Sequence, residues 1–304
     1  MHLIEAPDRS AASECDGRNL VFLVGCPRSG TTWLQRQLAC HPRIHTAIES
    51  HLFDHIIGPI LRRWEYSIDT RNGGMGPAAY YTEEEFFRMI RSFLRALLRP
   101  MIEDLRDGEI FLDKTPSHAL FLPEIVRLLP RCRIIHLLRD PRDVVASLLA
   151  ASRSFGSMWA PKDARAAIRM WTEHIWWVRR EGRRLPPAQF HEVRYEELLR
   201  APHEALKGCV EFLGLEWSDD EIARAVAANE KSIARSIGGT ALYVGGELAR
   251  NIGPNKRDPD GFVRRGISGS WRADLSLRER FWIWRTARKE MAELGYRWRF
   301  LFFV

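Results

Sequence analysis

The chain has 304 residues, 45% of them hydrophobic and 28% charged, and its formal net charge is +7. This composition excludes a disordered or fibrous chain, and the excess of basic residues favours an anionic ligand. The arginines are spread along the chain without a basic run, and no apolar run approaches the roughly 18 residues that span a membrane, so neither nucleic acid binding nor a membrane span is expected.

The cysteines indicate a reducing compartment. Cys15, Cys26, Cys40, Cys132 and Cys209 are scattered and include no C-x-x-C pair, so neither a disulfide framework nor a zinc site is predicted. The first residues contain no apolar stretch of signal-peptide length. We therefore expect a cytoplasmic protein with a single domain over residues 1–304 and a flexible segment over residues 1–18.

The first predicted strand, residues 20–25, leads into the turn CPRSG and then into a helix that begins at Thr31. Gly25 and Gly30 have the spacing of the phosphate-binding pattern G-x-x-x-x-G-K-[ST], but Thr31 stands where that pattern has lysine. The cation of this loop is instead Arg28. Because the amides of such a turn bind anions at a helix N-terminus, the loop predicts a phosphate site that lacks the lysine of ATP-using enzymes.

Further strands and helices alternate along the chain. This alternation predicts an α/β fold, P-loop-like, in which a central parallel sheet lies between two layers of helices. Ligands of such sheets bind at the carboxyl ends of the strands, where we expect Arg28, Lys114 and Arg139. The predicted strands are residues 109–116, 132–140 and 189–195, and the predicted helices are residues 82–100, 117–129, 141–150, 163–185, 196–215 and 276–296.

Two predicted helices begin with the sequence of a capping box, Thr82 with Glu85 and Ser276 with Glu279. Between residues 231 and 263 the periodic pattern stops in a segment rich in glycine, proline, asparagine and aspartate. Structureless segments of this length are usually functional or disordered. We therefore expect residues 231–263 to form a mobile loop over the site.

The sequence GCPRSGTTW resembles the 5′-phosphosulfate loop of sulfotransferases, which use 3′-phosphoadenosine 5′-phosphosulfate (PAPS) as donor. Arginine inside this loop is the form of tyrosylprotein and many bacterial sulfotransferases. The resemblance implies that the chain binds PAPS and releases adenosine 3′,5′-bisphosphate (PAP). It assigns the donor's 5′ end and base to Arg28, Ser29, Gly30, Thr31, Thr32 and Trp33.

A second segment, IIHLLRDPRDVVASLL, resembles the family motif in which an arginine and a serine hold the 3′-phosphate of the donor. The resemblance assigns these roles to Arg139, at a predicted strand end, and to Ser147, on the helix that follows. Both side chains can reach one dianion, where charge-assisted hydrogen bonds are strongest. The segment VRYEELL is similar to the one whose tyrosine, here Tyr195, contacts the adenine.

The C-terminal segment FVRRGISGSW is similar to the R-K-G-x-x-G-D-W element of the cytosolic branch of the family. The similarity implies that Arg264, Arg265 and Gly266 contact the same 3′-phosphate. Ser270 replaces the usual aspartate of this element, which removes the expected helix cap. The four matches follow the order of the family over residues 22–272.

Sulfuryl transfer to a hydroxyl needs cations at the departing oxygen. The expected cations are Arg28 and Lys114, and Lys114 resembles the lysine of K-x-P turns in glycan and tyrosylprotein sulfotransferases. A sulfuryl group carries a single negative charge, so we expect no metal. Thr31 and the lack of a convincing apolar strand that ends in an acidic metal ligand disfavour a conventional kinase or ATPase.

Sulfuryl transfer also needs a base for the acceptor proton, and two residues are candidates. The favoured one is Glu49, whose segment resembles that of tyrosylprotein sulfotransferases and the E-x-H-F-F-D run of heparan sulfate 3-O-sulfotransferases, where His51 and Asp54 match. Burial is expected to bring the pKa of Glu49 toward neutrality. His118 is similar to the histidine of the K-T-H turn, but lies two residues too late. The other histidines, His174 among them, are expected to be structural or exposed.

The function expected is transfer of a sulfuryl group from PAPS to a hydroxyl of a glycan, lipid or small molecule by in-line displacement, with His51 as a further catalytic residue beside Arg28, Glu49 and Lys114. Two alternatives are open. A variant P-loop phosphotransferase would depend on magnesium, and a non-catalytic module would bind PAP without sulfating any acceptor. Acceptor specificity is expected in residues 55–108 and 150–188, and the possibility of a homodimer is left open.

Overall fold

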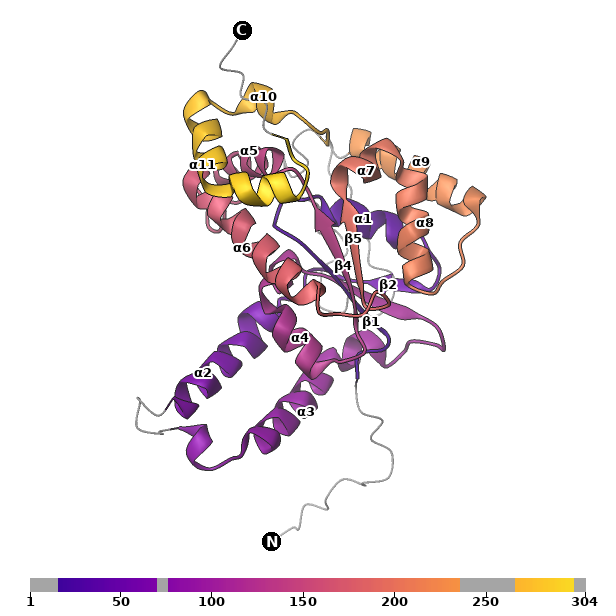
Figure 1. Ribbon diagram of the computed structural model, residues 1–304. Helices are drawn as coiled ribbons and strands as arrows, with labels where there is room; N and C mark the ends of the chain where they lie inside the picture. Colours follow the sequence, from indigo (N-terminus) through magenta and orange to yellow (C-terminus); the bar gives the residue numbers. More distant parts are fainter. Residues whose placement is uncertain (1–15, 70–75, 236–265, 298–304) are drawn as a thin grey trace.

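The computed structural model describes residues 16–69, 76–235 and 266–297, and a five-stranded sheet forms its centre (Figure 1). All pairings in the sheet are parallel, and the strand order is β2-β3-β1-β4-β5. The central strand β1 is buried along its whole length, which explains its apolar sequence LVFLV. The strands are β1 (Leu20–Val24), β2 (Ile44–Thr46), β3 (Ile110–Lys114), β4 (Arg133–Leu138) and β5 (Phe190–Arg194).

Helices cover both faces of the sheet. Val21 and Leu23 pack in one hydrophobic cluster and Leu20, Phe22 and Val24 in another, because successive side chains of a strand point to opposite faces. The predicted three-layer α/β fold is therefore confirmed (Figure 1). One helical layer contains α1 (Thr31–Leu38), α7 (Tyr195–Arg200), α8 (Pro202–Phe212) and α9 (Asp219–Arg235), and the other contains α4 (Leu122–Leu128), α5 (Pro141–Ser152), α6 (Ala164–Gly182) and α11 (Leu277–Glu293).

Two helices that extend away from the sheet form an arm, α2 (Gly58–Ile68) and α3 (Glu83–Ile102) (Figure 1). Trp64 of α2 stacks on Phe86 of α3, with ring centroids 4.0 Å apart. The sequence predicted α3 but not α2. The pair Gly58–Pro59 has the composition of a break, yet proline is favoured in the first turn of a helix, where its missing N–H costs no hydrogen bond.

Both predicted capping boxes are confirmed, since Thr82 and Ser276 each accept a hydrogen bond from the glutamate amide three residues later. The helix predicted over residues 196–215 is instead two helices, because Pro202 begins α8 and ends the run of α7. Similarly, a 3-10 turn over Pro116–Phe121 precedes α4.

The helix α9, which the sequence did not predict, continues to Arg235. The loop predicted over residues 231–263 is therefore wrong for residues 231–235, which are helical. The rest of that range lies outside the described residues, as do residues 1–15 of the predicted flexible segment.

Candidate active site

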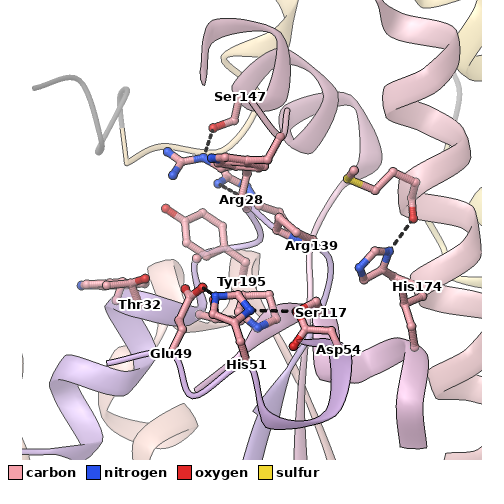
Figure 2. A pocket seen from close by; sticks show the side chains of 18 of the residues that line it. Arg28, Thr32, Glu49, His51, Asp54, Ser117, Arg139, Ser147, His174 and Tyr195 are labelled. Carbon is pink, nitrogen blue, oxygen red and sulfur yellow. Dashed lines mark hydrogen bonds and ion pairs between the residues drawn. The ribbon is translucent and has the colours of Figure 1, made fainter. Parts of the chain in front are cut away.

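A cavity of about 680 Å³ lies at the carboxyl ends of β1, β3 and β4 (Figure 2). Two predicted site residues are buried and do not line it, since Ser29 is 1% exposed and Lys114 is 5% exposed. Two more, Arg264 and Arg265, lie outside the described residues. The predicted residues in the cavity wall are Arg28, Gly30, Thr31, Thr32, Trp33, Glu49, His51, Arg139, Ser147, Tyr195 and Gly266.

The loop between β1 and α1 has a conformation that requires its glycines. Gly30 has a φ of 101°, and a Cβ atom there would lie 2.6 Å from the ring of Tyr195. At Gly25 a Cβ atom would lie 2.6 Å from the carbonyl oxygen of Leu137, so the loop passes close to β4. Thr31 begins α1 and lines the cavity, so the positive end of this helix faces the cavity, as an anion site requires.

Arg139 follows β4, and its guanidinium is fixed on several sides. It donates to the carbonyl oxygens of Arg28 and Ile267, both at 3.1 Å, and lies 4.0 Å from the ring centre of Tyr195. The buried Trp171 donates to its backbone carbonyl. The Nε of Arg139 is buried and has no hydrogen-bond partner among the described residues, so this guanidinium still has a donor to offer to an anion.

Arg28 and Ser147, which the resemblance assigns to opposite ends of the donor, contact each other. Arg28 has a positive φ of 74°, and its Nε donates to Ser147 Oγ at 3.2 Å (Figure 2). Its guanidinium also lies 5.2 Å from the ring centre of Phe155. Arg28 therefore extends toward α5 in this structure, away from the side of the cavity that holds Glu49 (Figure 2).

The segment that contains Gly266 is anchored by Asp143, which sequence reasoning did not select. The Asp143 carboxylate accepts hydrogen bonds from the amides of Gly269 and Trp271 and from Ser270 Oγ, at 2.7–3.1 Å. The serine that replaces the usual aspartate thus donates to a carboxylate on α5. Asp143 is the second acidic residue of the sequence RDPRD, and this motif was the signal that could have identified it.

Glu49 lies between two cationic groups. Lys114 Nζ donates to Glu49 Oε1 at 2.5 Å, and His51 Nε2 lies 3.3 Å from Glu49 Oε2. Burial raises the pKa of Glu49, but the hydrogen bond from His51 and the charge of Lys114 outweigh it and lower the pKa to about 2. The prediction of a nearly neutral pKa is therefore wrong, because sequence alone did not show that both cations contact the carboxylate.

His51 is a protonated residue at neutral pH. It has a positive φ of 50°, and its Nδ1 lies 2.8 Å from Asp54 Oδ2. The hydrogen bonds with Asp54 and Glu49 outweigh burial and raise the pKa of His51 to about 10. Asp54 also accepts a hydrogen bond from Ser117 Oγ at 2.6 Å, and the contacts with His51 and Ser117 outweigh burial and lower the pKa of its carboxyl.

His118, the second candidate base, is fully buried and does not line the cavity. Its Nε2 accepts a hydrogen bond from the amide of Phe53 at 3.2 Å, and its Nδ1 faces Asp113 at 3.7 Å. Burial lowers the pKa of His118. The lone pair of His118 Nε2 already accepts the hydrogen bond from Phe53, outside the cavity. The geometry therefore favours Glu49 as the base.

Strand β3 ends at Lys114, and the residue before it is the buried Asp113. Its two carboxylate oxygens accept hydrogen bonds from Ser50 Oγ at 2.5 Å and Thr115 Oγ1 at 2.7 Å. Asp113 therefore joins the segment after Glu49 to the turn after Lys114. It holds the two catalytic candidates at one edge of the sheet.

The side-chain ligand atoms of His51, Asp54 and His55 lie within 4.8 Å of one another, a spacing that could hold a metal ion. Both nitrogens of His51 face carboxylates, so a metal would have to displace its proton. The expectation that no metal is needed remains a prediction.

The cavity wall also contains mostly apolar residues that the sequence did not single out as site residues. Four of the lining residues come from the predicted specificity range 150–188, whereas the range 55–108 contributes His55. The hydrophobic periodicity of α6 does not distinguish core positions from cavity positions, so sequence carried no clear signal. The residues are Leu120, Phe155, Trp159, Met170 and His174.

Within the part of the chain that the structure describes, no helix has both the length and the apolar composition needed to cross a bilayer.

Comparison with known proteins gives one family. A sequence profile described as "Sulfotransferase family" matches residues 21–219. A proposed protein-tyrosine sulfotransferase of Caenorhabditis briggsae is 27% identical over 205 residues, which are 66% of this chain and 66% of that protein. Protein-tyrosine sulfotransferase 2 of Gallus gallus is 22% identical over 200 residues, which are 66% of this chain and 52% of that protein. The chain thus spans about half to two thirds of the length of these relatives.

Solved structures share the fold. Mouse sulfotransferase SULT7A1 complexed with PAP superposes with a TM-score of 0.58 at 17% identity, over 92% of this chain and 87% of that one. The sulfotransferase domain from the curacin biosynthetic pathway gives a TM-score of 0.56 at 17% identity, over 92% of this chain and 98% of that one.

Proposed function

Because the chain belongs to the sulfotransferase family, we propose that it transfers a sulfuryl group from PAPS to a hydroxyl group of an acceptor. One observation carries the proposal. A phosphate-type loop, a guanidinium with an unused donor and a carboxylate paired with a lysine meet at the carboxyl ends of three neighbouring strands. These are the groups that such a transfer needs for binding, for charge stabilisation and for proton removal.

The donor's 5′ end is assigned to the loop from Arg28 to Trp33, and its 3′-phosphate to Arg139 and Ser147. The unpartnered Nε of Arg139 and the buried, unpartnered Nε1 of Trp33 both suit a polar ligand here. Since Arg28 and Ser147 are hydrogen-bonded to each other, Arg28 must turn away from Ser147 for the two residues to serve opposite ends of one donor.

PAPS supplies a sulfuryl group whose bond to a phosphate oxygen breaks while a bond to the acceptor oxygen forms. Glu49 takes the proton of the acceptor hydroxyl. Arg28 stabilises the charge that develops on the departing oxygen, and Lys114 must turn from its buried position beside Glu49 to do the same. When Lys114 engages that oxygen, Glu49 loses one of the two cations that lower its pKa, and its burial then makes it a stronger base.

For the acceptor, the sequence favoured a glycan, lipid or small molecule. A phenol is one of the small molecules that the sequence left open, and the relatives named as protein-tyrosine sulfotransferases support a phenolic hydroxyl. The aromatic side chains Phe155 and Trp159 in the cavity wall support an aromatic acceptor. A cytoplasmic location and a homodimer remain proposals, to be tested by cell fractionation and by sedimentation of the purified protein.

The test has a binding part and a transfer part. Calorimetry should show tighter binding of PAP than of AMP, and radiolabelled PAPS should label at least one compound in a library of phenols, sugars, lipids and tyrosine peptides. No preference for PAP over AMP would refute the proposed donor site. Magnesium-dependent binding of ATP would favour a phosphotransferase, and PAP binding without labelling of any acceptor would favour a non-catalytic module.

A further inference from the structure

His174 on α6 has a nitrogen atom without a partner beside the cavity. The residue is 3% exposed and forms part of the cavity wall (Figure 2). Its Nδ1 lies 2.7 Å from the carbonyl oxygen of Met170. Because a carbonyl only accepts hydrogen bonds, Nδ1 carries the hydrogen and Nε2 has the lone pair. Nε2 is buried and has no hydrogen-bond partner within the described residues.

His174 is a neutral hydrogen-bond acceptor at physiological pH. Burial is the largest influence and lowers its pKa to about 4, so the ring stays uncharged. The cavity that His174 lines also has the apolar side chains of Leu120, Phe155, Trp159 and Met170 in its wall. A buried acceptor in such surroundings is costly unless a donor reaches it, and a ligand in the cavity can bring that donor.

We propose that His174 Nε2 accepts a hydrogen bond from a second donor group of the acceptor substrate. The acceptor class is then an aromatic alcohol that carries a hydroxyl or N–H in addition to the hydroxyl that is sulfated. Its ring packs against Phe155 and Trp159, its reacting hydroxyl faces Glu49, and its second donor faces His174. This inference rests on the proposed function and adds to it a residue that selects the acceptor.

The test compares two acceptors that differ in the second donor alone, a two-ring bisphenol and its monomethyl ether. We expect the unsubstituted protein to use the bisphenol with a kcat/KM about 10-fold higher than the ether, since a site built to hydrogen-bond a hydroxyl rejects an analogue without it. In His174→Phe, which keeps a ring but no acceptor atom, the ratio should fall to about 1. His174→Gln, which keeps an acceptor, should restore most of the ratio.

A matched control is His203→Gln on α8, which should leave the ratio unchanged. Calorimetry with PAP verifies that each variant keeps the donor site. If His174→Phe binds PAP normally and keeps the ratio, the inference is refuted while sulfuryl transfer stands. Transfer to sugars or peptides but to neither phenol would likewise overturn the acceptor class alone. If the unsubstituted protein sulfates nothing in the library, both the inference and the proposed function fail.

Discussion

The raised pKa of His51 leads to a specific prediction about stability. The ordinary pKa of 6.5 rises to about 10 because hydrogen bonds with Asp54 and Glu49 stabilise the charged ring. At about 1.4 kcal/mol per pH unit this difference corresponds to roughly 5 kcal/mol. The side chain is 35% exposed, so solvent screening reduces the expected contribution to about 1–2 kcal/mol.

The sign of the pH dependence follows from the direction of the shift. A raised pKa stabilises the folded protein fully below pH 6.5, and this contribution is lost as the pH rises through about 10. His51→Asn removes the charge but tolerates the positive φ at this position. The variant should therefore be less stable at pH 6 by about 1–2 kcal/mol, or about 2–5 °C in Tm, and the difference should vanish near pH 10.

The assay is thermal unfolding followed by circular dichroism at several pH values at low salt. His203→Asn is the control, because His203 contacts a single exposed carboxylate, that of Asp219, at 3.3 Å. The Tm of the control should change with pH in the same way as the Tm of the unsubstituted protein. If His51→Asn also runs parallel to it between pH 6.5 and 10, the two carboxylates do not hold a proton on this ring, and the reasoning is refuted.

Three further predictions concern the donor site and the base. Lys114→Met should raise the pKa of Glu49 above about 2. In the pH profile of kcat/KM, the pH at which activity falls on the acidic side should then move upward. If this pH does not move, the pairing of Lys114 with Glu49 is contradicted. Arg139→Ala should weaken PAP binding about 10- to 100-fold in calorimetry and leave AMP binding nearly unchanged. Arg28→Ala should lower kcat at least about 100-fold while PAP still binds, whereas equal losses would make Arg28 a binding residue alone.

Local sequence patterns predicted most of the framework. The predicted strands over residues 20–25, 109–116, 132–140 and 189–195 contain β1, β3, β4 and β5, and the capping sequences placed the starts of α3 and α11 correctly. The loop around Arg28 and the strand end at Arg139 were found because glycine spacing and the ends of parallel strands are visible in the sequence. The helix α2 was missed because its Gly-Pro start resembles a break.

The family resemblance brought Glu49, His51 and Lys114 into consideration as separate candidates. The contacts among these three residues could not be seen in the sequence. The pKa of Glu49 was therefore expected to rise, whereas the contacts lower it. The same holds for Asp143, which reaches across more than a hundred residues of sequence to hold the segment at Ser270.

The sequence by itself predicted the parallel sheet and a loop suited to an anion, because hydrophobic periodicity and glycine spacing are set by residues close together in the chain, while the family resemblance implied the donor. The tertiary structure decided which charged groups meet. Glu49 is held as a carboxylate by Lys114 and His51, and His174, which lines the cavity, has no hydrogen-bond partner for its Nε2 among the residues that the structure describes. Protonation and selectivity depend on distances between groups on different elements, and those distances exist once the helices have packed on the sheet.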